Sequence, residues 1–187
     1  MLHEAHEMLR TVVAGIDEDA WKSPTPCEQW NVAQVLRHAA GDQLAYTAAL
    51  TGSGGPTENP FTPSADRPAG PRDFLEAALT SSAAAFATIS PDATEVPSPL
   101  PLGPLPAATV LGAAALDAAV HAWDIAVATG QPDPLPAGLA ARLMPAATTI
   151  ADPLRGFAFA PALPAEPGDD AAAALLRHLG RDPHWAR

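Results

Sequence analysis

The sequence predicts an all-α protein: a four-helix bundle with one long crossover and a short C-terminal helical extension. Two observations lead to this fold class. Hydrophobic residues make up 48% of the 187-residue chain but aromatic residues only 5%, so the core must consist mainly of Ala, Leu and Val. Alanine favours helices and is depleted in strands. In addition, apolar residues recur with helical spacing in four long segments, which are separated by connectors rich in Pro and Gly.

The first predicted helix covers about residues 2–16. Four side chains share its apolar face through the spacing i, i+4, i+7 and i+11: Leu2, His6, Leu9 and Val13. The loop at 21–30 contains two prolines and two tryptophans. Because it carries so much aromatic surface, we expect this loop to fold back onto the bundle.

The second predicted helix begins after Asn31 and continues to about Leu50. Asn31 is a good N-cap residue, and Gln34 stands three positions later as its capping-box partner. The apolar face is formed by Val32, Val35, Leu36, Ala39 and Ala40. His38 and Asp42 lie one turn apart along the edge of that face, so both are available to a site next to the core.

Two connectors flank the third predicted helix. The segment at 51–70 is rich in Gly, Pro and Ser, and we expect it to be mobile. Pro71 opens the helix at a position where a missing N–H costs nothing, and the apolar stripe continues to Ile89. Residues 90–106 contain six prolines, which predicts an extended crossover rather than a helix.

The fourth predicted helix covers about residues 107–129. Shorter helices are predicted after it, at 136–150 and 169–179. We therefore divide the chain into a four-helix bundle with the candidate site, residues 1–130, and a short extension packed on that bundle, residues 131–187.

The composition excludes several classes of function. The net charge of −11 argues against binding to nucleic acid or to an anionic membrane, because both require basic patches. The first residues are too acidic for a signal peptide, and we find no apolar run suited to span a membrane. A single cysteine excludes an internal disulfide. We expect a soluble cytoplasmic protein that acts on a small molecule, as a monomer or homodimer.

Three polar residues interrupt the fourth helix: Asp117, His121 and Asp124. At about 100° per residue, His121 is rotated by about 40° from Asp117, and Asp124 by about 20° in the other direction, so all three point the same way. Their neighbours form an apolar stripe that belongs in the core: Leu116, Val120, Trp123 and Val127. Polar groups at the border of a core need partners.

A divalent metal ion is one such partner. An acid and an imidazole one turn apart, Asp117 and His121, can converge on one ion, and His38 is the natural third ligand from another helix. Three protein ligands leave positions open for water or substrate, as in catalytic sites. In the alternative interpretation Asp117 and His121 form only an intrahelical ion pair. His6 is either a further site residue or a core histidine.

Other candidate residues have plainer interpretations. Cys27 has no cationic neighbour in the sequence except Lys22, and Glu28 follows it directly, so we expect it to pack rather than react. We expect Trp30 and Trp123 to be core anchors rather than ligand stackers. The sequence leaves two roles open, pairing with acids or binding a carboxylate, for three arginines: Arg155, Arg177 and Arg181.

Three separated blocks together resemble the mycothiol-dependent maleylpyruvate isomerase group of the DinB-like superfamily, and more narrowly its short actinobacterial metal-binding members. The blocks are "PTPCEQWNVAQVLRHAAG", which ends at Gly41, "LDAAVHAWDIAVATGQP", which begins at Leu116, and "LLRHLGRDPHW", which ends at Trp185. The resemblance covers nearly the whole chain, and the three blocks are specific only in combination.

The resemblance implies a DinB-like bundle with a divalent metal at one end, usually zinc or nickel, held by a His on the second helix and a Glu/His or His/His pair on the fourth. These ligands fall on His38, Asp117 and His121. Asp117 stands where the isomerase pattern has Glu, so its carboxylate reaches less far. We expect Asp124 to orient His121, with a helix-end charge as the alternative, and place Asp42 and His6 around the site.

The resemblance also implies the chemistry. We expect a metal-dependent transferase or isomerase that uses a low-molecular-weight thiol such as mycothiol on a small electrophilic metabolite. The segment after Gly130 is much shorter than the C-terminal domain of the larger isomerases, which leaves isomerase activity open. The alternatives are a metal-binding or small-molecule-binding protein without thiol chemistry, and a biosynthetic enzyme repurposed on the same fold.

Overall fold

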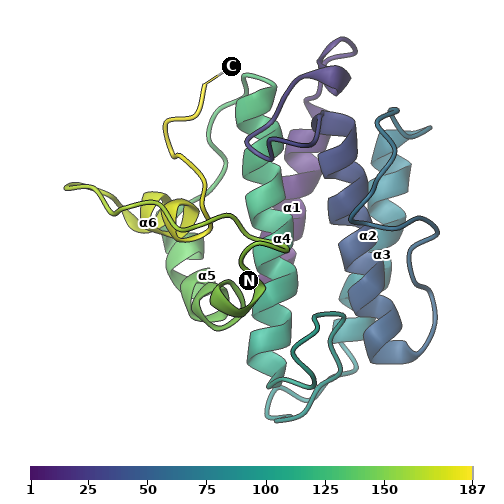
Figure 1. Ribbon diagram of the computed structural model, residues 1–187. Helices are drawn as coiled ribbons and strands as arrows, with labels where there is room; N and C mark the ends of the chain where they lie inside the picture. The colour runs from purple at the N-terminus through teal and green to yellow at the C-terminus, as the bar shows by residue number, and fades with distance from the viewer. Residues whose placement is uncertain (187) are drawn as a thin grey trace.

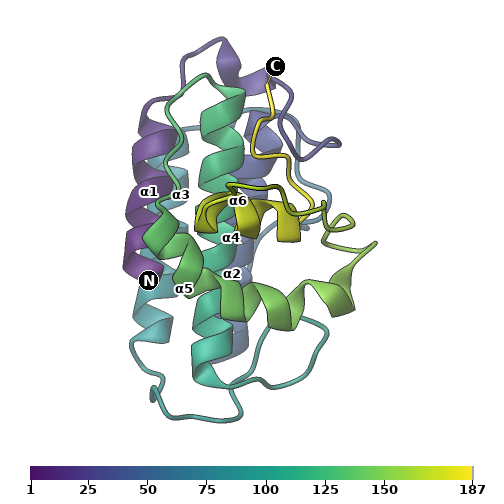
Figure 2. The same ribbon diagram turned by 90° about the vertical axis from the view of Figure 1, so that its left-hand side faces the viewer.

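The computed structural model describes residues 1–186, and within them the protein is all-helical, as predicted (Figure 1). The helices are α1 (Leu2–Ala14), α2 (Val32–Thr51), α3 (Pro71–Phe86), α4 (Ala107–Ala128), α5 (Ala137–Ile150) and α6 (Ala171–His178), with short 3₁₀ turns η1 (Ala20–Lys22) and η2 (Asp152–Leu154). Helices α1 to α4 run lengthwise beside one another, and α5 and α6 lie across one side of α4 (Figures 1 and 2).

Helix α4 is the centre of the molecule. It packs against α1, α2 and α5, while α3 closes the bundle against α1 and α2, and α6 packs on α5. Small residues permit this crowding. A Cβ atom added at Gly112 would lie 2.7 Å from Cβ of Ala146 on α5, so glycine lets the two helices approach closely.

The apolar character of α4 is explained by this central position. On length and composition alone α4 could cross a membrane, contrary to our expectation that no segment of the chain has that character. However, 83% of its most apolar window is buried inside the protein. Its apolar side chains therefore form the core of the bundle.

The helix boundaries follow local signals. The capping box at the start of α2 is present: the Asn31 side chain accepts from the Gln34 backbone N–H, and the Gln34 side chain accepts from that of Asn31. Helix α3 ends at Phe86, three residues before the last position of its apolar stripe. Helix α6 begins only at Ala171, because Asp170 caps it by accepting from a backbone N–H.

The conformations of two connectors agree with those predicted from composition, whereas a third connector is held by more contacts than expected. The loop at 21–30 folds back as expected, with Trp21 buried. The crossover at 90–106 is extended, with one antiparallel bridge between Val96 and Leu105. The connector at 52–70 has more contacts than we expected of a mobile segment, because its backbone carbonyls accept hydrogen bonds from four side chains at the start of α2: Asn31, Gln34, Arg37 and His38.

Candidate metal centre

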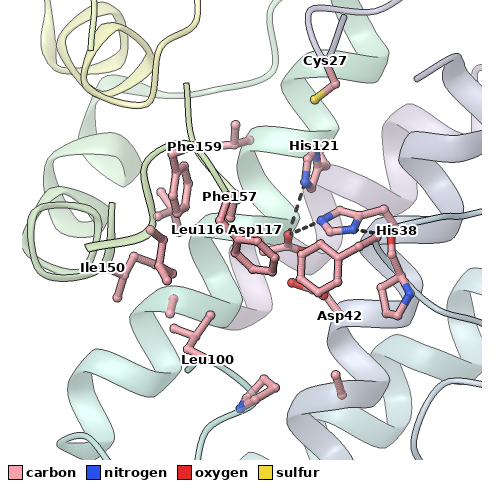
Figure 3. A pocket seen from close by; sticks show the side chains of 18 of the residues that line it. Cys27, His38, Asp42, Leu100, Leu116, Asp117, His121, Ile150, Phe157 and Phe159 are labelled. Carbon is pink, nitrogen blue, oxygen red and sulfur yellow. Dashed lines mark hydrogen bonds and ion pairs between the residues drawn. The ribbon is translucent and has the colours of Figure 1, made fainter. Parts of the chain in front are cut away.

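The three predicted ligands meet where α2 packs on α4. Nε2 of His38 lies 3.5 Å from Oδ1 of Asp117, and Nε2 of His121 lies 3.3 Å from the same oxygen. The two imidazole ring centroids are 4.8 Å apart. One ligand atom from each residue lies within 4.8 Å of the others, and Figure 3 shows the three side chains converging.

Backbone and side-chain partners aim both imidazoles at Asp117. Nδ1 of His38 is 2.8 Å from the carbonyl oxygen of Pro60 in the 52–70 connector. Since a carbonyl only accepts, Nδ1 carries the proton and Nε2 faces Asp117. Nδ1 of His121 is 2.9 Å from Oδ2 of Asp124, so this nitrogen also carries a proton and Nε2 faces Asp117.

Asp124 is itself clamped by an arginine from the chain end. The tail after α6 runs back towards α4 (Figure 1). It brings Nε and Nη2 of Arg181 to 2.9 Å from the two carboxylate oxygens of Asp124. This fork is the strong geometry for an arginine–carboxylate pair. The structure thus places Asp124 between Arg181 and His121 rather than at a solvated helix end.

The electrostatics favour charged forms despite burial. Burial opposes ionisation of Asp117, but the charge of His121 and the hydrogen bond from its ring lower the pKa of Asp117. Burial also opposes the charged form of His121, yet Asp117 and Asp124 hold the pKa of His121 well above its usual range. Without metal, Asp117 and His121 thus form the intrahelical ion pair of the alternative interpretation, with the same atoms that could ligate a metal.

Asp124 and Arg181 behave similarly. Burial raises the pKa of Asp124, but the positive charge of Arg181 and the hydrogen bond from His121 outweigh it and lower that pKa. Burial disfavours the charged guanidinium, and Asp124 more than offsets this, so the pKa of Arg181 is raised. Both groups therefore stay charged at all ordinary pH values.

The residues fit a divalent metal ion. Oδ2 of Asp117 is buried and has no geometric hydrogen-bond partner within residues 1–186. The carboxyl of Asp42 interacts with Asp117 but donates a hydrogen bond only while it is protonated, whereas a cation would satisfy the buried carboxylate in either state of Asp42. Two imidazole nitrogens and a carboxylate oxygen are a common ligand set for zinc and also suit nickel. Although Asp is shorter than Glu, its Oδ1 already lies close to both Nε2 atoms.

The two remaining predicted site residues lie in different surroundings. Asp42 lines the same cavity as the three ligands, where burial and the charge of Asp117 raise its pKa to about 7. His6 lies elsewhere. Its Nε2 is 3.0 Å from Oε1 of Gln43 between α1 and α2, and it does not line the cavity. The structure therefore places His6 in the alternative role that the sequence left open, a core histidine.

The three predicted ligands face a cavity of about 560 Å³, within the range of small-molecule sites. Its walls come from the 21–30 loop, α2, α4, residues 99–101 and the C-terminal segment after α5 (Figure 3). Trp30 lines this cavity with its ring centroid 4.6 Å from that of His38, although we expected a core anchor. Trp123 is fully buried, as expected of an anchor.

Sequence reasoning missed the surroundings of Cys27. Its Sγ lies 3.2 Å from Oδ2 of Asp124 and 3.3 Å from Nη2 of Arg181, so a cation is present that the local sequence did not supply. Cys27, His121 and Asp124 also lie within 4.8 Å of one another. They form a poorer cation site than the first three residues, because Arg181 already occupies both oxygens of Asp124.

Comparison with known proteins identifies similar sequences. A family model described as the mycothiol maleylpyruvate isomerase N-terminal domain matches residues 2–126. Two uncharacterized proteins of the actinobacterium Mycobacterium tuberculosis, Rv0738 of strain H37Rv and MT0763 of strain CDC 1551 / Oshkosh, are each 32% identical to this chain. The alignment covers 95% of this chain and 96% of theirs. No solved structure matches the chain.

Proposed function

This chain belongs to the mycothiol maleylpyruvate isomerase N-terminal domain family, and on that basis we propose that it is a metal-dependent enzyme using a low-molecular-weight thiol. The proposed metal is a divalent ion, zinc or nickel, and the proposed thiol is of the mycothiol type. The reaction is transfer of the thiol to a small electrophilic metabolite, or isomerisation of that metabolite. We place this activity in the cytoplasm, with no nucleic-acid or membrane partner, in a monomer or homodimer.

One observation carries the proposal: two imidazole Nε2 atoms and the buried carboxylate of Asp117 converge at the wall of a cavity. When bound there, a divalent metal with open positions lowers the pKa of a bound thiol or water, which becomes a nucleophile at neutral pH. His38, Asp117 and His121 would hold the ion.

The neighbouring residues have supporting roles in this proposal. The carbonyl of Pro60 and the carboxylate of Asp124 keep the Nδ1 protons in place, so that both Nε2 lone pairs are available. Arg181 neutralises Asp124. Asp42 presents a further carboxyl group to the same cavity and is positioned to accept the proton of an arriving thiol.

The test begins with elemental analysis of protein purified without an affinity tag. We expect stoichiometric divalent metal in the wild type and in His184→Ala, whose imidazole is exposed, and none in His121→Ala. Thiol consumption, which reports transfer, and conversion of the substrate to its isomer, which leaves the thiol unconsumed, are then both measured with mycothiol and a panel of small electrophiles that includes maleylpyruvate. His121→Ala should lose turnover together with metal, and full turnover by metal-free protein would refute the proposal.

A second candidate, a small-molecule-binding protein or biosynthetic enzyme without thiol chemistry, is favoured by one observation. Between residues 154 and 159 the cavity wall consists of apolar side chains, which offer no hydrogen bonds to a polyhydroxylated thiol. Thermal shifts of the metal-loaded protein with mycothiol separate the two. Stabilisation by mycothiol favours the thiol enzyme, and stabilisation only by thiol-free ligands favours the second candidate.

A further inference from the structure

The cavity has two chemically different walls. The polar wall carries the three predicted ligands and Asp42, all from α2 and α4. Facing it is an apolar wall that comes mainly from α4 and the segment after α5: Leu116, Val120, Ile150, Leu154 and Phe159. In Figure 3, Ile150 and Phe159 lie on one side of Asp117, and His38 and Asp42 on the other.

With the proposed divalent ion bound, the charges along the cavity leave room for one anionic group, which that ion would balance. Among the described residues that line it, Arg181 is the only lysine or arginine. Its guanidinium is already paired with Asp124, so it is not free for a ligand. A second anionic group on a ligand would be buried without a cation, which is costly. A ligand with two carboxylates therefore matches this cavity poorly.

The mouth of the cavity is also apolar. Phe61 and Phe157 are the two large hydrophobic side chains that are exposed in residues 1–186, at 44% and 64%. Both line the cavity, and their ring centroids are 5.1 Å apart. Phe61 comes from the 52–70 connector and Phe157 from the segment after α5, and Phe61 also contacts the ring of His38. Exposed aromatic rings beside a pocket are typical of a binding surface.

We propose that the substrate is an alkyl or aromatic molecule with a single polar or anionic reacting end. That end lies at His38, Asp117 and His121, and the hydrocarbon body lies against the wall formed by α4 and residues 150–159, covered by Phe61 and Phe157. The role of the reacting end rests on the proposed function, whereas the placement of the hydrocarbon body does not need the metal.

Isothermal titration calorimetry tests the two parts separately. For the hydrocarbon body, metal-free protein is titrated with 1-butanol, 1-hexanol and 1-octanol, and affinity should rise about fourfold per added methylene group. For the reacting end, Zn²⁺-loaded protein is titrated with acetate, hexanoate, octanoate and hexanedioate. Affinity should rise with chain length, and hexanedioate should bind at least ~10-fold more weakly than hexanoate, because its second carboxylate finds no cation.

A matched pair of variants locates the binding surface. Phe157→Ala should weaken octanol and octanoate about tenfold and leave acetate unchanged, because the exposed ring contacts only the hydrocarbon body. Phe74→Ala, on α3 and outside the cavity, should change none of these affinities.

The outcomes distinguish the two proposals. Alcohol affinities that do not depend on chain length, or equal binding of hexanedioate and hexanoate, would overturn the substrate class even if zinc is bound. If the protein binds no zinc but its affinity for the alcohols still rises with chain length, the proposed function is overturned. The apolar wall then remains a binding site for the hydrocarbon body. An unchanged octanol affinity in Phe157→Ala would show that Phe157 does not cover the bound hydrocarbon body.

Discussion

Two buried histidines in this bundle, His6 and His121, show how similar burial leads to different chemistry. Both are almost inaccessible, at 1% and 7% exposure. His6 contacts Gln43, whose amide also accepts from the hydroxyl of Ser82 and donates to the carbonyl of Ala114. Each group in this cluster is neutral and has a partner, which is the state expected of polar groups in a core.

His121 lies among charges instead. It contacts Asp117 and Asp124, and one buried oxygen of Asp117 has no geometric hydrogen-bond partner within residues 1–186. Burial lowers the pKa of His6, whereas the carboxylates outweigh burial and raise the pKa of His121. A buried histidine is therefore a candidate ligand here only where carboxylates and an unsatisfied oxygen accompany it.

The largest expected effect comes from the unsatisfied oxygen. Asp117→Asn keeps the shape of the side chain but removes its charge, so we expect divalent metal affinity to fall more than ~100-fold, since one of three ligands is lost. Competition with a chromophoric chelator measures this affinity. Gln43→Glu, which adds a carboxylate beside His6 but no cavity, should not create a second metal site. Retention of wild-type affinity by Asp117→Asn would show that the ion is held elsewhere.

A smaller loss of metal affinity is expected when the Arg181–Asp124 pair that supports His121 is broken. Arg181→Gln removes the charge that balances Asp124, and we expect metal affinity to fall about 10- to 100-fold, as for other groups that orient a ligand. Arg177→Gln is the matched control, because Arg177 pairs with Glu166 and Asp169 and does not line the cavity. If both variants lose affinity equally, the effect reflects loss of the C-terminal segment rather than the clamp.

His6 should matter for stability and not for metal. His6→Ala leaves Oε1 of Gln43 with one donor fewer, and we expect the free energy of unfolding to fall by about 1–3 kcal/mol. Urea denaturation in the presence of EDTA measures this change. Metal content of the folded variant should equal that of the wild type, and a variant that lost its metal would place His6 in the site after all.

The smallest effect is the pH dependence due to His6. Burial lowers its pKa in the folded protein, so between that value and the unfolded pKa the unfolded chain binds more protons. The contribution of His6 to stability is thus fully present above its unfolded pKa and is lost as pH falls below about 6.5. We expect the metal-free wild type to lose more stability between pH 7.5 and pH 5.5 than metal-free His6→Gln. Parallel curves would contradict this assignment.

The main features of the fold follow from local sequence signals. Alanine-rich periodic segments predicted an all-α bundle, and this is confirmed. Asn31 and Gln34 marked the start of α2 to the residue, because capping depends only on neighbours in the chain. The spacing of Asp117 and His121 placed both on one side of α4, because helix geometry alone determines that relation.

Other features could not be predicted, because they depend on contacts between distant segments. The sequence around Cys27 contains no cation except Lys22, yet Arg181 reaches it from the chain end. Phe61 looked like part of an unstructured connector, and only the folded chain sets it beside Phe157. The same holds for Trp30, whose ring turns out to lie against His38.

The sequence by itself determined the helices and the polar stripe on α4, because these depend on residue type and on spacing within one element. It also indicated the family, because the three sequence blocks are recognisable without the fold. Only the tertiary structure decided that His6 stays apart from His38 and His121, which arginine binds Asp124 behind them, and which side chains line the cavity. These outcomes depend on how helices far apart in the chain pack together, and on burial, which sets the free energy of each charge.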